Sequence, residues 1–237
     1  MVKKKLFFLP YAGASVMTYA PWKKYFSKDI ELVFLEMQGR GIKSDQKISY
    51  DISIVVDSLF QEIKDDISGE EYIIFGHSMG SLLAYELYYK IEAEGFKLPT
   101  AVVLSGRMIP ELCVQMKNVS DYPDADFLNE VAIYGGLPDE ITSNKDLRDY
   151  FVPILRADFK LIESYTYPGK REKIGCKLIV LYGSEDYTTP PDRMMEWRKK
   201  ARIMFLCIEV PGDHFFCMDE KNSKNISNII QKIFTQD

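Results

Sequence analysis

One short segment of the chain has the residue types and spacing of a nucleophilic serine. Residues 76–80, GHSMG, form a G-x-S-x-G motif between the apolar run 71–75 and an amphipathic stretch over about 79–94. Glycine two positions to either side of the serine leaves room for a sharp strand-to-helix turn. Such a turn exposes the Ser78 hydroxyl and directs the positive end of the next helix at a developing oxyanion. A turn without chemistry is the alternative, but the flanking strand and helix favour the nucleophile.

A serine hydroxyl needs a base to take its proton, and histidine is the side chain best suited to this at neutral pH. The chain contains two histidines. His77 precedes the serine on the turn itself, so we expect its ring to project away from Ser78. His214 lies on a glycine-containing loop after the apolar run 204–210 and before the last amphipathic stretch. We therefore predict that His214 is the base, with a structural histidine as the alternative.

A carboxylate is needed to fix the tautomer of the imidazole and to stabilise its cation. Asp186 follows the strand-like run 177–182, and the order serine, aspartate, histidine is that of α/β hydrolases. Glu185 is the alternative acid. Asp213 is adjacent to His214 in the chain, so its carboxylate is badly placed to bond that ring. The sequence therefore predicts Asp186 as the third member of a catalytic triad.

An oxyanion hole requires two backbone N–H donors near the nucleophile. The first predicted donor is the N–H of Met79, the residue after the serine. The second is expected in the loop 9–15, where small residues let the backbone approach a substrate. We favour the N–H of Ala12, with that of Tyr11 in reserve. The alternative for this loop is a plain turn in which Ser15 caps the next helix.

Short apolar runs alternate with helix-period segments, a pattern that predicts an α/β fold with a mostly parallel central sheet flanked by helices. Together with the serine motif it predicts the α/β-hydrolase fold. The expected strands are 5–9, 31–35, 71–75, 100–105, 177–182 and 204–210, and the expected helices are about 16–27, 52–67, 79–94, 190–201 and 222–235.

The segment from about 110 to 170 interrupts this alternation. It contains no convincing strand, only helical periodicity with many acidic and aromatic residues. Neither of its ends is rich in Gly and Ser, as a linker would be. We therefore predict one domain over 1–237, with a core of about 1–109 and 171–237 and a helical lid inserted over about 110–170.

The 237-residue chain is 46% hydrophobic and 27% charged, the composition of an ordinary globular protein. Its net charge of −5 argues against nucleic-acid binding. No apolar run approaches the roughly 18–20 residues of a membrane span, and the stretch 6–9 is too short for a signal peptide. Because the four cysteines form no CxxC pair, we predict no metal site and a reduced, cytoplasmic protein: Cys113, Cys176, Cys207 and Cys217.

Several segments outside the serine motif resemble the type II thioesterases, the free-standing editing hydrolases of nonribosomal peptide and polyketide assembly lines. The resemblance extends over about residues 6–219, and two of its segments, in the predicted lid, have no counterpart in generic esterases. The segments are FLPYAG at 8–13, GRG at 39–41, SGRMIP at 105–110, YGGLPDE at 134–140 and PILRADFKLIESY at 153–165.

The resemblance implies hydrolysis of acyl thioesters on the phosphopantetheine arm of carrier proteins, which clears mis-primed or stalled arms. The implied partners are acyl or peptidyl carrier protein domains and small acyl thioesters. No cofactor is expected, because the substrate carries the phosphopantetheine, and a monomer is the default. Apolar lid residues and one loop residue are candidates to line the acyl site, with packing of the lid onto the sheet as the alternative for the lid residues: Tyr11, Leu128, Ile133, Leu137, Phe151 and Phe159.

Two other functions stay open on the sequence. The first keeps the chemistry but changes the substrate, to that of a medium-chain fatty acyl thioesterase or a general carboxylesterase. The second is a non-catalytic binding module on the same fold. Binding modules of this kind usually lose a member of the triad, whereas all three positions are filled here.

Overall fold

The structure is a computed structural model that describes residues 4–113 and 118–235. Its centre is a six-stranded sheet with the order β2-β1-β3-β4-β5-β6, in which every neighbouring pair of strands is parallel. All six strands lie at nearly the predicted positions, which confirms the predicted fold class. They are β1 (Lys4–Leu9), β2 (Ile30–Phe34), β3 (Glu71–His77), β4 (Ala101–Ser105), β5 (Lys177–Gly183) and β6 (Met204–Val210).

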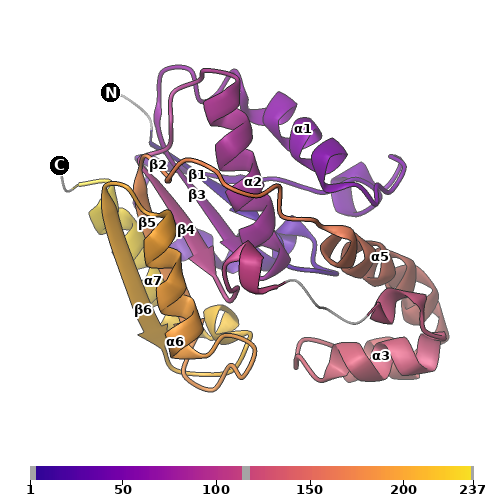
Figure 1. Cartoon of the computed structure of the whole chain (residues 1–237). Coiled ribbons are helices and arrows are strands. Elements are labelled where there is room, and N and C mark those ends of the chain that lie inside the picture. Colours follow the sequence, from indigo (N-terminus) through magenta and orange to yellow (C-terminus); the bar gives the residue numbers. More distant parts are fainter. Residues whose placement is uncertain (1–3, 114–117, 236–237) are drawn as a thin grey trace.

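The central strands are apolar at nearly every position because both faces of the sheet are covered. Successive side chains of a strand point to opposite faces. Thus Phe7 packs in the core formed with α1 (Ile52–Ile63) and α2 (Met79–Ala93), whereas Phe8 packs in a second core with α7 (Glu220–Ile233). Figure 1 shows α1 and α2 together on one side of the sheet.

The parallel arrangement brings the carboxyl ends of the strands to one edge of the sheet. At this edge His77, the last residue of β3, is paired with Ser105, the last residue of β4. Ser78 follows β3, Asp186 follows β5 and His214 follows β6. Sites in open α/β sheets lie at this edge, so the topology alone gathers three residues that are far apart in the chain.

The described residues between β4 and β5 contain three α-helices: α3 (Asp124–Ala132), α4 (Asp139–Ser143) and α5 (Lys145–Ser164). The described residues of 110–170 contain no strand, as expected. Apolar residues of α3 and α5 form a small core of their own, in which the rings of Phe127 and Phe159 meet edge to face at 5.5 Å. Figure 1 shows α3 and α5 together at one side of the molecule, beyond the sheet.

Two predicted helices differ from expectation. The segment predicted over 16–27 is a series of 3₁₀ turns from Val16 to Tyr25 that contains Pro21, whose missing N–H and fixed ring prevent a regular α-helix. The segment predicted over 190–201 divides into a short α6 (Pro191–Met194) and a 3₁₀ turn (Met195–Lys200). Pro191 occupies the first helical position, which suits its lack of an N–H.

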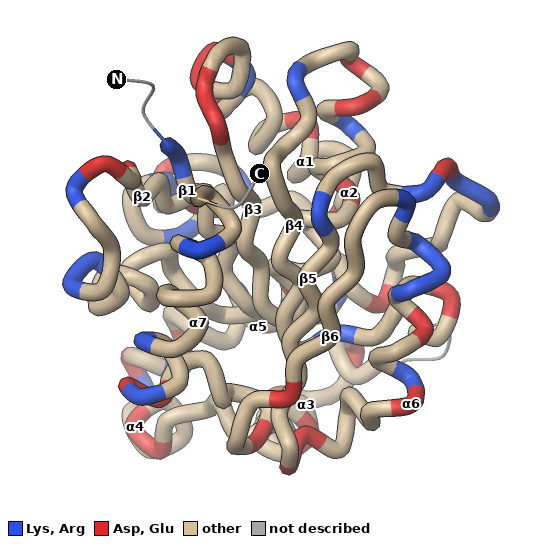
Figure 2. The backbone as a smooth tube through the Cα atoms, turned by 90° about the vertical axis from the view of Figure 1, so that its left-hand side faces the viewer, with Lys and Arg blue, Asp and Glu red and all other residues tan. Residues whose placement is uncertain are grey.

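Charged residues lie mainly around the outside of the fold. In Figure 2 basic and acidic segments alternate along the peripheral loops and helices, while the strands in the middle are almost free of charge. No helix in the described part of the chain is long and apolar enough to cross a membrane. The four cysteines are free thiols, of which Cys176 and Cys217 are buried.

Candidate active site

Ser78 sits in a strained turn between β3 and α2. Its φ of 54° makes it the only residue other than glycine with a positive φ among those described. The turn is tight enough that a Cβ on Gly76 would lie 2.0 Å from the carbonyl oxygen of Gly80. A Cβ on Gly80 would lie 2.4 Å from the carbonyl oxygen of Leu9. The glycines of the motif are therefore required by close backbone approach, as the sequence predicted.

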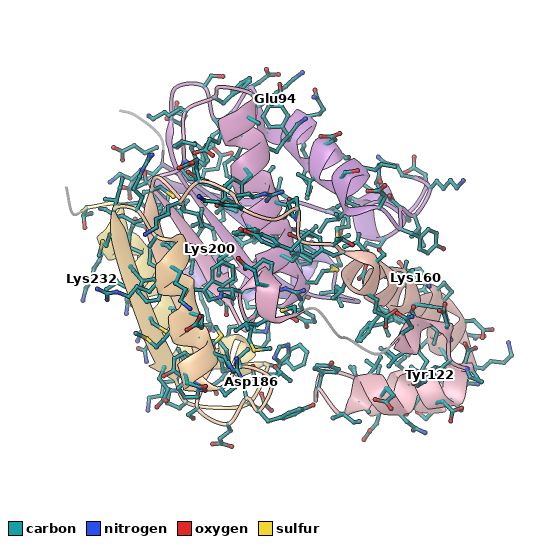
Figure 3. The ribbon with its side chains drawn as sticks, viewed as in Figure 1. Glu94, Tyr122, Lys160, Asp186, Lys200 and Lys232 are labelled. Carbon is teal, nitrogen blue, oxygen red and sulfur yellow. The ribbon has the colours of Figure 1, made fainter. Side chains whose placement is uncertain are left out.

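The three predicted triad side chains are in direct contact. Nε2 of His214 lies 3.0 Å from Oγ of Ser78, and Nδ1 of His214 lies 2.8 Å from Oδ2 of Asp186. One hydrogen-bonded series thereby joins Ser78 to His214, 136 positions away in the chain, and His214 to Asp186, 28 positions away. Figure 3 shows Asp186 at the end of the sheet nearest α3. Nucleophile, base and orienting acid have the geometry of nucleophilic catalysis.

Two threonines that the sequence analysis did not consider hold Asp186 in its ionised form. Thr188 donates its backbone N–H at 2.9 Å and its hydroxyl at 2.6 Å to Oδ1, and the Thr189 hydroxyl donates to Oδ2 at 2.8 Å. Burial alone would raise the pKa of Asp186, but His214 and the threonine hydroxyls lower it to about 2. An aspartate followed two and three positions later by threonine is a local turn signal that could have identified these donors.

The alternative base and acids have hydrogen-bond partners or surroundings other than those of the triad. His77 is fully buried, and its Nδ1 lies 2.9 Å from Oγ of Ser105. Burial, followed by the charge of the neighbouring imidazole, lowers the pKa of His77 to about 3, so it is neutral at neutral pH. Glu185 is exposed, and the carboxylate of Asp213 accepts a backbone N–H of its own loop. None of these groups takes the place of His214 or Asp186.

The two predicted oxyanion donors have no competing partner. Met79 is the first residue of α2, so its N–H has no acceptor within the helix. In the loop after β1, Ala14 donates to the carbonyl of Tyr11 at 3.0 Å, and Gly13 donates to Asp158 at 2.7 Å. No hydrogen bond in the described part of the chain uses the N–H of Ala12. The alternative prediction for this loop, that Ser15 caps the segment that follows, is also confirmed, because Ser15 Oγ accepts the N–H of Met17 at 3.4 Å.

A buried ion pair ties α5 to this loop. Arg40 Nη1 lies 2.6 Å from Oδ2 of Asp158, and Nη2 lies 2.5 Å from Oδ1, with both side chains almost wholly buried. The same Oδ2 accepts the N–H of Gly13, and Arg40 also donates to the carbonyl of Ala14 at 3.2 Å. Both charged residues lie in segments that carry the family resemblance, but the sequence analysis gave them no role. The sequence signal that could have identified this pair was Asp158, an acidic residue among the apolar residues of an amphipathic helix.

An apolar cavity of about 570 Å³ opens onto Ser78 and His214. Four of the predicted lining residues border it: Tyr11, Leu137, Phe151 and Phe159. Leu128 and Ile133 are not among the described residues that border it. Leu128 packs into the small core between α3 and α5, and Ile133 is 59% exposed.

This arrangement has the groups needed for acyl transfer to a serine. It combines a nucleophile, a base with its orienting acid, backbone donors for an oxyanion and an apolar space for an acyl chain. Within residues 4–113 and 118–235, no group of three or more His, Cys, Asp or Glu side chains is placed to hold a metal ion.

Residues 4–234 match the Thioesterase domain family. The chain belongs to this family. The thioesterase is 28% identical to the gramicidin S biosynthesis protein GrsT of Aneurinibacillus migulanus over 92% of its own length and 85% of the relative's. It is likewise 28% identical to the human medium-chain S-acyl fatty acid synthase thioesterase, over 96% and 86% of the two lengths. Among solved structures, ClbQ from the colibactin NRPS/PKS pathway superposes with a TM-score of 0.91 at 29% identity, covering 98% and 97% of the two chains.

Replacing Asp158 by alanine tests the buried ion pair. We expect the Asp158→Ala thioesterase to lose about 3–5 kcal/mol of unfolding free energy, because Arg40 is left as an unpaired buried charge. Chemical denaturation measures this loss. The matched control is Asp149→Ala on the same helix, which removes an exposed pair with Lys145 and is expected to cost about 0.5 kcal/mol or less. Equal losses in the two variants would contradict the structural role of the pair.

The low pKa of His77 predicts a dependence of stability on pH. An unfolded histidine takes up a proton near pH 6.5, whereas His77 in the folded thioesterase does so only near pH 3. Its contribution to stability is therefore complete above about pH 6.5 and is lost as the pH falls towards 3. Between pH 7 and pH 4.5 we expect His77 to account for a loss of roughly 2–3 kcal/mol.

The comparison is with His77→Gln, which keeps a hydrogen-bonding side chain but does not titrate. Urea denaturation at both pH values should show a smaller loss on acidification in the variant than in the wild type. Parallel losses would mean that His77 is not held neutral in the folded state.

Proposed function

We propose that this thioesterase hydrolyses acyl thioesters on the phosphopantetheine arm of carrier proteins and thereby removes mis-primed or stalled acyl groups in nonribosomal peptide or polyketide synthesis. The observation that carries the proposal is the hydrogen-bonded series Ser78–His214–Asp186 at the mouth of an apolar cavity. Further support comes from the relatives, since GrsT is named for gramicidin S biosynthesis and ClbQ for an NRPS/PKS pathway.

In the first half of the reaction Ser78 Oγ attacks the thioester carbonyl carbon while His214 Nε2 takes the hydroxyl proton. The negative charge that develops on the carbonyl oxygen is stabilised by the N–H groups of Met79 and Ala12. Asp186, ionised at neutral pH, stabilises the imidazolium. The tetrahedral intermediate then breaks its C–S bond. The sulfur leaves readily as a thiolate, since the pKa of the thiol is near 8.5, and it then takes the proton from His214, which returns to the neutral imidazole.

In the second half a water molecule replaces the thiol. His214 takes a proton from the water as its oxygen attacks the acyl-serine carbonyl, and the same two N–H groups stabilise the new oxyanion. Breakage of the ester bond returns the proton to Ser78 Oγ and releases the acid. The segment 110–170 acts in this proposal as a lid, because Leu137, Phe151 and Phe159 border the cavity that receives the acyl chain.

A medium-chain fatty acyl thioesterase is the second candidate. Two observations favour it: the similarity to the human medium-chain fatty acid synthase thioesterase, and an apolar cavity of about 570 Å³. Rates on acetyl-loaded carrier protein, decanoyl-loaded carrier protein and the corresponding CoA esters separate the two. A preference for decanoyl substrates over acetyl ones would favour the second candidate.

Replacement of Ser78 by alanine tests the proposal. We expect Ser78→Ala to lower the rate of deacylation of acetyl-loaded carrier protein by at least about 10⁴-fold, because the nucleophile is lost. Mass spectrometry of the carrier protein measures the loss of the acetyl group. The same variant should fail to react with a fluorophosphonate probe that labels the wild type at Ser78.

The matched control is Ser68→Ala, which removes an exposed serine just after α1. It should deacylate the carrier at the wild-type rate and keep its reaction with the probe. Wild-type protein that neither deacylates the carrier nor reacts with the probe would be a binding module, and the proposal would be rejected.

A further inference from the structure

The loop that carries Ala12, the second proposed oxyanion donor, contains a four-residue turn over residues 11–14. The turn is closed by a hydrogen bond of 3.0 Å from the N–H of Ala14 to the carbonyl of Tyr11. Gly13, at the third position, has a φ of 79°, a value that glycine adopts without strain. The closing bond does not use the N–H of Ala12. The direction of this donor therefore depends on how the whole turn is held.

Helix α5 of the inserted segment holds the turn at Gly13. The carboxylate of Asp158 accepts the N–H of Gly13 at 2.7 Å, although the two residues are 145 positions apart in the chain. One helical turn before Asp158, Leu155 packs so closely on the loop that a Cβ on Gly13 would lie 2.4 Å from Cδ2 of the leucine. Residues three positions apart share one face of a helix. One face of α5 thus makes both an apolar contact and a hydrogen bond to the turn.

Asp158 is itself fixed in place and separated from the cavity. Arg40 binds both carboxylate oxygens, at 2.6 and 2.5 Å, and also donates to the carbonyl of Ala14 at 3.2 Å. Asp158 is 1% exposed and is not among the residues that border the cavity, whereas Ala12 and Gly13 do border it. A substrate in the cavity therefore meets the turn and not the carboxylate, so any effect of Asp158 on the reaction passes through the turn.

We infer that Asp158 is a positioning residue for the oxyanion hole: by fixing the N–H of Gly13 it directs the neighbouring N–H of Ala12 at the thioester oxygen. The inference rests on the proposed thioester hydrolysis, with Ala12 as an oxyanion donor. Because peptide units are planar, a bond that fixes one amide of a turn restricts the direction of the next. A donor stabilises an oxyanion only over a narrow range of distances, and a misplacement of about 1 Å costs on the order of 100-fold in rate. An acid of the inserted segment thus completes a site that the core otherwise builds.

The experiment compares two variants that differ only in the acceptor for Gly13. Both carry Arg40→Met, so that neither leaves an unpaired buried arginine. Arg40→Met/Asp158→Asn keeps an amide oxygen that accepts the N–H of Gly13, whereas Arg40→Met/Asp158→Leu has a side chain of similar shape with no acceptor. On acetyl-pantetheine we expect the asparagine variant to retain most of the wild-type kcat. The leucine variant should lose about 10- to 100-fold in kcat, with KM changed less than about 3-fold.

A second measurement reads the oxyanion hole directly. With a trifluoromethyl ketone of the acyl chain, Ser78 Oγ adds to the ketone carbon, the carbonyl electron pair moves to the oxygen, and His214 takes the hydroxyl proton. The adduct carries the oxyanion of the tetrahedral intermediate. Its inhibition constant should rise in the leucine variant by about the factor by which kcat falls. The pH profile of kcat should keep its shape, because the triad is unchanged. A purely structural role for Asp158 would not produce this selective loss.

Equal kcat values in the two variants would overturn the inference, whether both are high or both are low. A rise in KM at unchanged kcat would also overturn it, because the loss would then concern binding of the acyl chain. Asp149→Ala, which removes an exposed ion pair from the same helix, should keep the wild-type kcat and inhibition constant. If the leucine variant fails to fold, Arg40→Met/Asp158→Ala replaces it, with kcat taken per active site titrated with the fluorophosphonate probe.

The outcome for Asp158 is separate from the outcome for the proposed function. Wild-type hydrolysis of acetyl-pantetheine that is lost in Ser78→Ala supports the thioesterase whatever the Asp158 variants show. A wild type that does not hydrolyse the thioester would count against the proposed function. The ketone still tests Asp158 in that case, because formation of its adduct needs Ser78 and the oxyanion hole but no turnover.

Discussion

The site depends on a backbone turn that most residues cannot form. Ser78 holds a φ of 54° between β3 and α2, and side chains on Gly76 or Gly80 would collide with the backbone that surrounds the turn. The turn persists because β3 and α2 are both deeply buried and pack on each other, so the rest of the fold bears the local strain. Its consequence is that one hydroxyl projects beyond the sheet, and every other functional group is arranged relative to it.

Electrostatics divides the nearby ionisable groups into distinct roles. The chain has two histidines. His77 is buried and is therefore neutral at neutral pH, whereas His214 is hydrogen-bonded to Ser78 and Asp186. Asp186 is kept ionised by hydrogen bonds that outweigh its burial. The separation follows from environment and not from residue type, since the two histidines differ in their burial and partners, as do the neighbouring acids Glu185 and Asp186.

The inserted segment is joined to the core by charge as well as by apolar contact. Asp158 on α5 binds both Arg40 and the N–H of Gly13, so the position of α5 and the shape of the loop that carries Ala12 are linked. Arg107, which borders the cavity, follows β4, just before the chain leaves the core for α3 and α5. The buried charge of Arg40 is thus neutralised within the protein by Asp158.

The sequence by itself predicted the strands and the three residues Ser78, Asp186 and His214 that the structure brings together, because apolar runs and turn motifs are local patterns and the order of the three along the chain is set by the topology. Where a predicted helix differed from the structure, the cause was also local, since Pro21 breaks the helix expected over 16–27. Only the tertiary structure decided that Leu128 and Ile133 are not among the described residues that border the cavity, and that Arg40 meets Asp158 across 118 positions. These outcomes depend on which elements pack together and on how much solvent is excluded between them, and neither quantity is encoded in the spacing of neighbouring residues.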